Sequence, residues 1–193
     1  NSWNNAPVIY IVDEGEQYNK YVAFGTAGLI FPGGISGFNE HGISVSLHQM
    51  NTAIYKFDQD NESAYIMPFL QQRILREARS IDDARKIIEN SKVYSSWSIF
   101  ISDANRNEVA SFEVAAKKYT EARRFKDTPM GQSNHFVHQD MQKHHFHNRY
   151  SSYMETTGRL SYITEKLKNS KGQIDVDWMM KELASHMDPY EKR

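Results

Sequence analysis

The order of local patterns along the chain constrains its fold more than any other feature of the sequence. Residues 7–12 form an apolar, β-branched run, and residues 43–48 alternate apolar with polar side chains, as strands do. Two helical patterns follow over about residues 66–89, with apolar positions three and four apart and a capping box that begins at Ser80. Strand patterns return between residues 97 and 124, and the C-terminal part is again helical.

This alternation of two strand blocks with two helical pairs predicts an α+β fold. We expect a four-layer αββα sandwich, in which two stacked antiparallel sheets are covered on their outer faces by helices. The helices at about residues 65–90 and 150–187 then lie on opposite outer faces. No linker or repeat divides the chain, so we expect residues 1–193 to be a single domain, and an incomplete portion of a larger one because no initiator methionine is present.

Composition excludes several classes of function. The chain carries 23 basic and 24 acidic residues, and its formal net charge of −1 offers no broad basic field for nucleic acid. No apolar run is long enough to span a membrane. The absence of cysteine removes disulfides, thiolate zinc sites and a cysteine nucleophile from these residues. No phosphate-binding or dinucleotide-binding fingerprint occurs, and no cofactor is expected.

A dense group of histidines raises the question of a metal site. Its members are His135, His138, His144, His145 and His147. Zinc sites need three or four converging ligands with supporting hydrogen bonds, and carboxylates are sparse in this region. We therefore expect a solvated loop and no bound metal, with a place at the rim of a pocket as the second alternative.

Three local patterns carry the candidate chemistry. The first is residues 37–48, with the sequence GFNEHGISVSLH, and the second is residues 133–136, with the sequence SNHF. The third ends in residues 157–159, TGR, early in a helix. Taken singly, each has a structural explanation, because such an asparagine turns or caps the backbone and a helix arginine extends over its own surface.

Taken together and in this order, the patterns resemble the N-terminal-nucleophile (Ntn) amide hydrolases, in particular the branch of isopenicillin N acyltransferase and choloylglycine hydrolase. The resemblance extends from about Pro7 to about Pro189. It implies the αββα sandwich and a nucleophilic cysteine at a mature N-terminus that autoproteolytic processing exposes. The free α-amino group of that residue serves as its base, and water or an amine resolves the acyl-enzyme.

The resemblance assigns catalytic roles to three residues. The Asn134 side-chain amide would be one oxyanion-hole donor, and the backbone N–H of His48 would be the second, at a position where the family has asparagine. Arg159 matches an arginine that orients the site near the nucleophile. The two donors must converge on one small volume, although 86 residues separate them in the sequence.

The chain departs from the family pattern because it has no cysteine and lacks the segment that follows the nucleophile. We therefore expect the nucleophile on the remaining part of the same polypeptide and no amidase activity from these residues alone. The expected substrate is a small-molecule acylated amine or amide. A non-catalytic binding domain with the same fold and a lipid amide or ester hydrolase stay open as alternatives, and so does a homo-oligomer.

Overall fold

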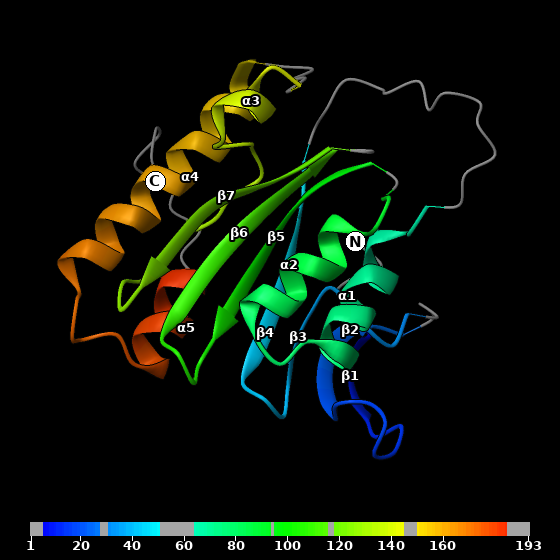
Figure 1. Ribbon diagram of the computed structural model, residues 1–193. Helices are drawn as coiled ribbons and strands as arrows, with labels where there is room; N and C mark the ends of the chain where they lie inside the picture. The colour runs from blue at the N-terminus through cyan, green and yellow to red at the C-terminus, as the bar shows by residue number, and fades with distance from the viewer. Residues whose placement is uncertain are drawn as a thin grey trace.

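One antiparallel sheet of seven strands organises the chain (Figure 1). The computed structural model describes residues 6–27, 31–50, 64–93, 95–115, 118–144 and 150–184. The strands are β1 (Pro7–Val12), β2 (Tyr21–Thr26), β3 (Ser36–Asn39), β4 (Ile43–Gln49), β5 (Ser96–Asp103), β6 (Glu108–Ala115) and β7 (Lys118–Lys126). The helices are α1 (Met67–Glu77), α2 (Ile81–Glu89), α3 (Gln139–Gln142), α4 (Tyr150–Asn169) and α5 (Val176–Ala184). Each strand pairs with the next along the chain.

The two strand blocks that were expected to form separate sheets join into one. β4 and β5 are antiparallel neighbours from Ile43↔Asp103 to Gln49↔Trp97, although α1 and α2 lie between them in the sequence. The α+β class and the helix-covered antiparallel sheet are confirmed, whereas the described residues do not form two stacked sheets. The reason is that backbone hydrogen bonds join the edges of the two blocks, and the alternation of side chains does not reveal which edges will pair.

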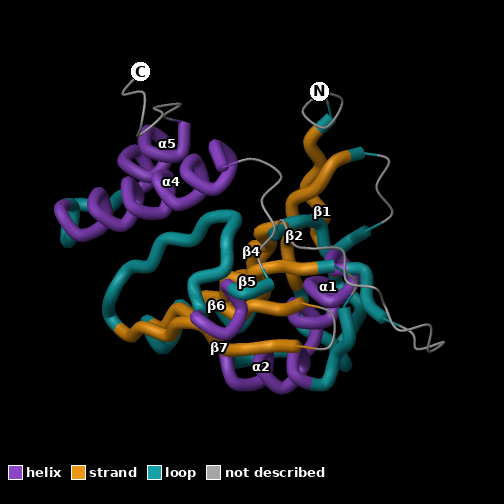
Figure 2. The backbone as a smooth tube through the Cα atoms, turned by 90° about the horizontal axis from the view of Figure 1, so that it is seen from above, coloured by secondary structure: helices purple, strands orange, loops and turns teal. Residues whose placement is uncertain are grey.

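α1 and α2 cover one face of the sheet and form the main core with it. The helices contribute Leu70, Ile74 and Ile88, each at most 1% exposed. The strands contribute Ile43, Val45, Ile99, Ile101, Ala110, Phe112 and Val114. Gly33 permits a close approach of α1, because a Cβ there would lie 2.5 Å from the Pro68 carbonyl oxygen. α4 and α5 lie on the other side of the sheet (Figure 2).

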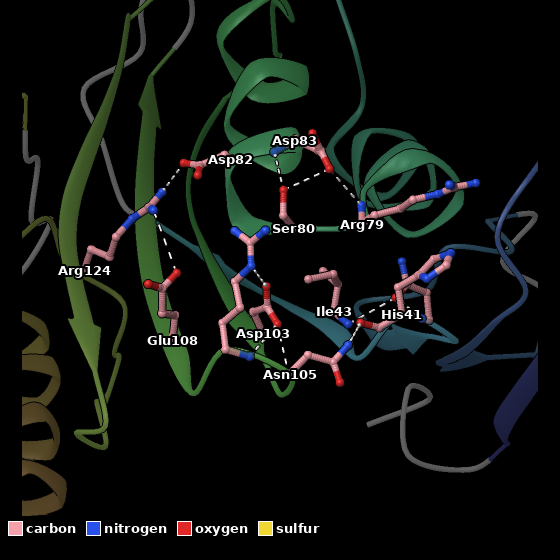
Figure 3. A network of polar contacts seen from close by, with 12 residues as sticks. His41, Ile43, Arg79, Ser80, Asp82, Asp83, Asp103, Asn105, Glu108 and Arg124 are labelled. Carbon is pink, nitrogen blue, oxygen red and sulfur yellow. Dashed lines mark hydrogen bonds and ion pairs between the residues drawn. The ribbon is translucent and has the colours of Figure 1, made fainter.

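The predicted capping box begins α2 and helps to fix it on the sheet (Figure 3). The Asp83 backbone N–H donates to Ser80 Oγ at 3.1 Å, and the Ser80 hydroxyl donates to Asp83 Oδ2 at 2.9 Å. Arg124 of β7 reaches the Asp82 carboxylate at 2.9 Å. This ion pair ties the first turn of α2 to the last strand of the sheet.

The asparagine of the first sequence pattern has a structural role. Asn39 is 3% exposed, and its amide donates to the carbonyl oxygens of Leu75 at 3.0 Å and Ala78 at 2.8 Å, at the C-terminal end of α1. Its Oδ1 accepts from the backbone N–H groups of His41 and Ile43, both at 3.1 Å. Asn39 therefore joins the end of α1 to the turn before β4, and its side chain is committed to that junction.

Candidate active site

The face of the sheet that α1 and α2 leave uncovered carries polar side chains. Ser44, Ser46 and His48 point to this far face from β4, because side chains alternate along a strand and their neighbours lie in the core. Ser98 of β5 is the partner of His48 in the sheet register, and Glu113 of β6 is the partner of Ser98. Both Ser98 and Glu113 are 0% exposed. A polar row thus crosses three strands beside the end of β4.

The segment after β7 brings Asn134 to the end of β4. Its Nδ2 donates to the backbone carbonyl oxygen of Gln49 at 3.0 Å, across 85 residues of sequence. Its Oδ1 accepts from Arg159 Nη2 of α4 at 3.4 Å. Guanidinium groups only donate and carbonyl oxygens only accept, so the two contacts agree on which amide atom is the nitrogen. The structure therefore brings Asn134 and Arg159 together at the end of β4.

The His48 side chain lies close to the same point. Its Nε2 is 3.2 Å from Ser46 Oγ. Burial, and secondarily the positive charge of Arg159, lower the pKa of His48 from an ordinary 6.5 to about 4. The imidazole is therefore neutral at neutral pH and adds no second positive charge beside the Arg159 guanidinium.

The backbone at the end of β4 offers two N–H groups that point in opposite directions. Leu47 donates toward the β3 side at 3.1 Å, whereas Met50 donates toward β5 at 3.0 Å. N–H groups alternate along an antiparallel strand, so His48 directs its N–H toward β5 and Gln49 directs its N–H to the other side. The Gln49 carbonyl shares that direction and accepts from Asn134. From this alternation we infer that the Gln49 N–H points to the same side as the Asn134 amide, whereas the role that the resemblance assigns to the His48 N–H stays a prediction.

Two buried groups hold the segment that carries Asn134. Thr156 of α4, 3% exposed, accepts the Asn134 backbone N–H on Oγ1 at 2.8 Å. The Glu113 carboxylate accepts the backbone N–H groups of Val137 at 2.6 Å and His138 at 3.2 Å. Burial raises the pKa of Glu113, and these two N–H groups oppose the increase. The segment is therefore anchored at Asn134 itself and again three and four residues after it.

Gly131 allows α4 to pack directly against this segment. A Cβ at that position would lie 2.6 Å from Ile163 Cγ2, so a larger residue would force the Ile163 side chain or the helix to shift. From β7, Arg123 donates to the Gly131 carbonyl oxygen at 2.9 Å and also to the Gln132 side chain. Helix, strand and loop are thus in contact just before Asn134.

Sequence reasoning did not identify Gln49, Glu113 or Thr156. Glu113 carried a signal, because an acidic side chain in the middle of an apolar strand is costly unless it is hydrogen-bonded. Gln49 carried no signal, because it contacts Asn134 through its backbone carbonyl, which every residue has. Thr156 carried no signal, because a threonine on a helix is ordinary until its neighbours in space are known.

Three members of the histidine group, His135, His138 and His144, lie within the described residues. Within the described ranges no three His, Cys, Asp or Glu side chains lie close enough to hold a metal. His135 is 7% exposed and its Nδ1 contacts Thr156 Oγ1 at 3.3 Å, so the expected solvated loop is wrong for this residue, which is enclosed against α4. His138 accepts a backbone N–H at the start of α3. His145 and His147 lie outside the described residues.

Comparisons with known proteins point to one family. The family described as acyl-coenzyme A:6-aminopenicillanic acid acyl-transferase matches residues 6–190. A search of curated proteins found no significant match. In the described part of the chain, no helix combines the length and apolar character needed to cross a membrane.

Solved structures share the fold at low sequence identity. The Caenorhabditis elegans ortholog of N-acylethanolamine-hydrolyzing acid amidase matches 94% of this chain and 74% of its own, with a TM-score of 0.59 and 17% identity. A mutant conjugated bile acid hydrolase from Clostridium perfringens matches 94% and 68%, with a TM-score of 0.52 and 13% identity. A second variant of that hydrolase matches 67% of this chain and 48% of its own, with a TM-score of 0.48 and 12% identity. The chain thus spans about half to three quarters of these structures.

Proposed function

Because the chain belongs to the family of acyl-coenzyme A:6-aminopenicillanic acid acyl-transferases, as the resemblance of its motifs anticipated, we propose that it forms most of an Ntn amide hydrolase or acyltransferase. The observation that carries the proposal is the meeting of Asn134, the Gln49 backbone and Arg159 at the end of β4. The nucleophile is supplied by the part of the polypeptide that precedes Asn1. The substrate class is a small acylated amine, in line with the named amide-hydrolysing activity of the Caenorhabditis elegans structure.

The proposal also accounts for the far face of the sheet. Ile9, Ile11 and Phe38 lie on that face at 63%, 84% and 48% exposure, and an apolar patch of this kind is normally covered. In the proposed αββα arrangement, a second sheet from the remaining polypeptide covers it. The nucleophile then enters beside the polar row of β4–β6.

The proposed reaction assigns one role to each group at the site. The nucleophile attacks the amide carbonyl carbon while its own α-amino group takes the proton, which then passes to the departing amine. The Asn134 amide and the Gln49 N–H donate to the oxygen that becomes negative. Arg159 donates to Asn134 Oδ1, which polarises the amide and strengthens its N–H donors. Water or an acceptor amine then resolves the acyl-enzyme.

The oxyanion role is tested by Asn134→Ala in the complete natural polypeptide. We expect kcat for release of the amine to fall about 10²–10³-fold, as for other oxyanion-hole donors, with a small change in KM. Asn90→Ala is the matched control, because Asn90 caps the C-terminal end of α2 on the opposite side of the sheet, where its amide donates to the Lys86 carbonyl at 2.8 Å. Equal kcat values for the two variants would remove Asn134 from the mechanism.

The position of the nucleophile is tested separately. We expect the 193-residue chain alone to show no turnover and the natural polypeptide to lose turnover when its mature N-terminal residue is replaced by alanine. Turnover by the isolated chain would contradict the proposal and direct attention to Ser46 and Ser133. A natural N-terminal residue other than Cys, Ser or Thr would favour a binding domain. Turnover of esters without amides would favour a lipid ester hydrolase.

A further inference from the structure

We propose that Thr156 is a positioning residue for Asn134, an inference that rests on the proposed function of that amide. Thr156 lies in α4 and makes hydrogen bonds to three consecutive residues of the facing segment. Its Oγ1 accepts the Asn134 backbone N–H at 2.8 Å and contacts His135 Nδ1 at 3.3 Å. The Ser133 hydroxyl is 2.6 Å from the Thr156 carbonyl oxygen and also contacts Oγ1.

The Thr156 hydroxyl makes every hydrogen bond that it can make, as the positions of the protons show. The Thr156 carbonyl can only accept, so Ser133 donates its single hydroxyl proton there. The proton between the two hydroxyl oxygens then comes from Thr156 and goes to Ser133 Oγ. The lone pairs of Oγ1 accept from the Asn134 N–H and from a protonated Nδ1 of His135. A single buried hydroxyl thus has one donor and two acceptor contacts, and all three are to residues at or next to Asn134.

Thr156 acts together with Arg159, which lies three residues further along α4. Residues three apart share one face of a helix, so both side chains reach the same segment. Thr156 holds the backbone of Asn134, whereas Arg159 contacts the side-chain oxygen. Asn134 is therefore held between α4, through Thr156 and Arg159, and the end of β4, through Gln49. A shift of α4 relative to β4 would change the direction of the Asn134 amide.

The second anchor of the segment makes this role separable from general stability. Glu113 binds the N–H groups of Val137 and His138 independently of α4. Loss of the Thr156 hydroxyl therefore leaves the segment attached to β6 and releases it only around Asn134. A displacement of about 1 Å at a catalytic group can cost about 10²-fold in rate.

The kinetic test compares Thr156→Val, which keeps the shape of the side chain, with Thr156→Ser, which keeps the hydroxyl. In the natural polypeptide we expect Thr156→Val to lower kcat about 10–100-fold with KM changed less than about threefold, and Thr156→Ser to recover most of the loss. Thr164→Val is the control, since the Thr164 hydroxyl donates to the Leu160 carbonyl at 2.6 Å within the same helix. Equal losses in the Val and Ser variants would overturn the proposal, and so would an unchanged kcat in Thr156→Val.

Hydrogen exchange of the natural polypeptide gives a readout that needs no activity. We expect Thr156→Val to speed exchange of the Asn134 amide by about tenfold or more, while the Val137 amide, bound to Glu113, exchanges as in the wild type. Unchanged exchange at Asn134, or equal acceleration at both amides, would overturn the role of Thr156. If Thr156→Val does not fold, Thr156→Ser provides the comparison, and accelerated exchange of the Asn134 amide in that variant would overturn the role of the hydroxyl. Absence of turnover in the wild-type polypeptide would refute the proposed function alone, because exchange still measures the anchoring of Asn134.

Discussion

The two faces of the sheet are built from the same strands but use their side chains differently. In β5, Ile99 points into the core beneath α1 and α2, whereas its neighbour Ser98 points to the far face. Both residues are 0% exposed, but the Oγ of Ser98 has no hydrogen-bond partner in the part of the chain that the structure describes. The same holds for Ser111 Oγ on β6. Burial of an apolar side chain such as Ile99 therefore stabilises the chain, whereas burial of a hydroxyl without a partner, such as that of Ser98, costs free energy.

This difference agrees with the proposal that the far face carries the reaction while the helix side holds the main apolar core. On the helix side, apolar alternation brings Ile43, Val45, Ile99, Ile101, Ala110, Phe112 and Val114 of β4–β6 into one core with α1 and α2. On the far side, buried hydroxyls, the Glu113 carboxylate and a neutral imidazole lie together, and the candidate oxyanion donors meet at its edge. Perturbed and poorly satisfied polar groups of this kind concentrate at functional sites.

The largest expected change in stability comes from a substitution in the core between the sheet and helices α1 and α2. Ile99→Ala removes a fully buried side chain from the core, and we expect the free energy of unfolding to fall by about 2–5 kcal/mol. Urea denaturation of the 193-residue chain measures it. A loss below about 1 kcal/mol would mean that the core under α1 and α2 is packed less closely than the structure has it.

The next effect concerns the junction between that face and the end of α1. Asn39→Asp keeps an acceptor for the turn but points a negative oxygen at the Leu75 and Ala78 carbonyls, in place of the amide donor. We expect a loss of about 2–3 kcal/mol in unfolding free energy. Asn90→Asp serves as the control, because it places the same charge at the exposed C-terminal end of α2 and should cost about 1 kcal/mol at most. Equal effects of the two substitutions would contradict the structural role of Asn39.

The far face should show its own pH dependence through His48. The unfolded chain binds a proton on this imidazole below about pH 6.5, whereas the folded chain, with the pKa of His48 lowered to about 4, does so only below that value. The stability that His48 contributes is therefore complete above pH 6.5 and is lost as the pH falls from 6.5 to 4.

We expect the wild type to lose about 1–2 kcal/mol more than His48→Asn between about pH 7 and 4.5. NMR titration should show one imidazole with a midpoint near 4. A midpoint near 6.5 for His48 would show that its ring is solvated and far from Arg159.

The smallest expected change in stability comes from Ser98, whose side chain lies on the face of β5 opposite to that of Ile99. Ser98→Ala removes a buried hydroxyl that has no partner among the described residues, so we expect stability to stay constant or rise by up to about 1 kcal/mol. The adjacent Ile99→Ala, which removes atoms from the opposite face, supplies the contrast in the same denaturation experiment. A loss of more than about 1 kcal/mol in Ser98→Ala would show that the hydroxyl is bonded and that the two faces are satisfied equally.

Much of the fold could be predicted from local sequence patterns. Alternation and helical spacing located the longer strands, the two helical pairs and the capping box of α2, because these depend on side chains a few residues apart. Family motifs identified Asn134, His48 and Arg159 as candidate site residues, whose catalytic roles stay predictions. The structure brings Asn134 and Arg159 into contact at the end of β4.

The remaining features depend on contacts between residues that are far apart in the sequence. The pairing of β4 with β5 converted two expected sheets into one, and the Asn134 amide donates to the Gln49 carbonyl across 85 residues of sequence. Thr156 and Glu113 gained their roles only through hydrogen bonds to residues more than 20 positions away. By itself, the sequence determined which residues turn inward and which family the motifs resemble. Only the tertiary structure decided which backbone groups and buried side chains surround Asn134, because register and helix packing depend on the whole chain at once.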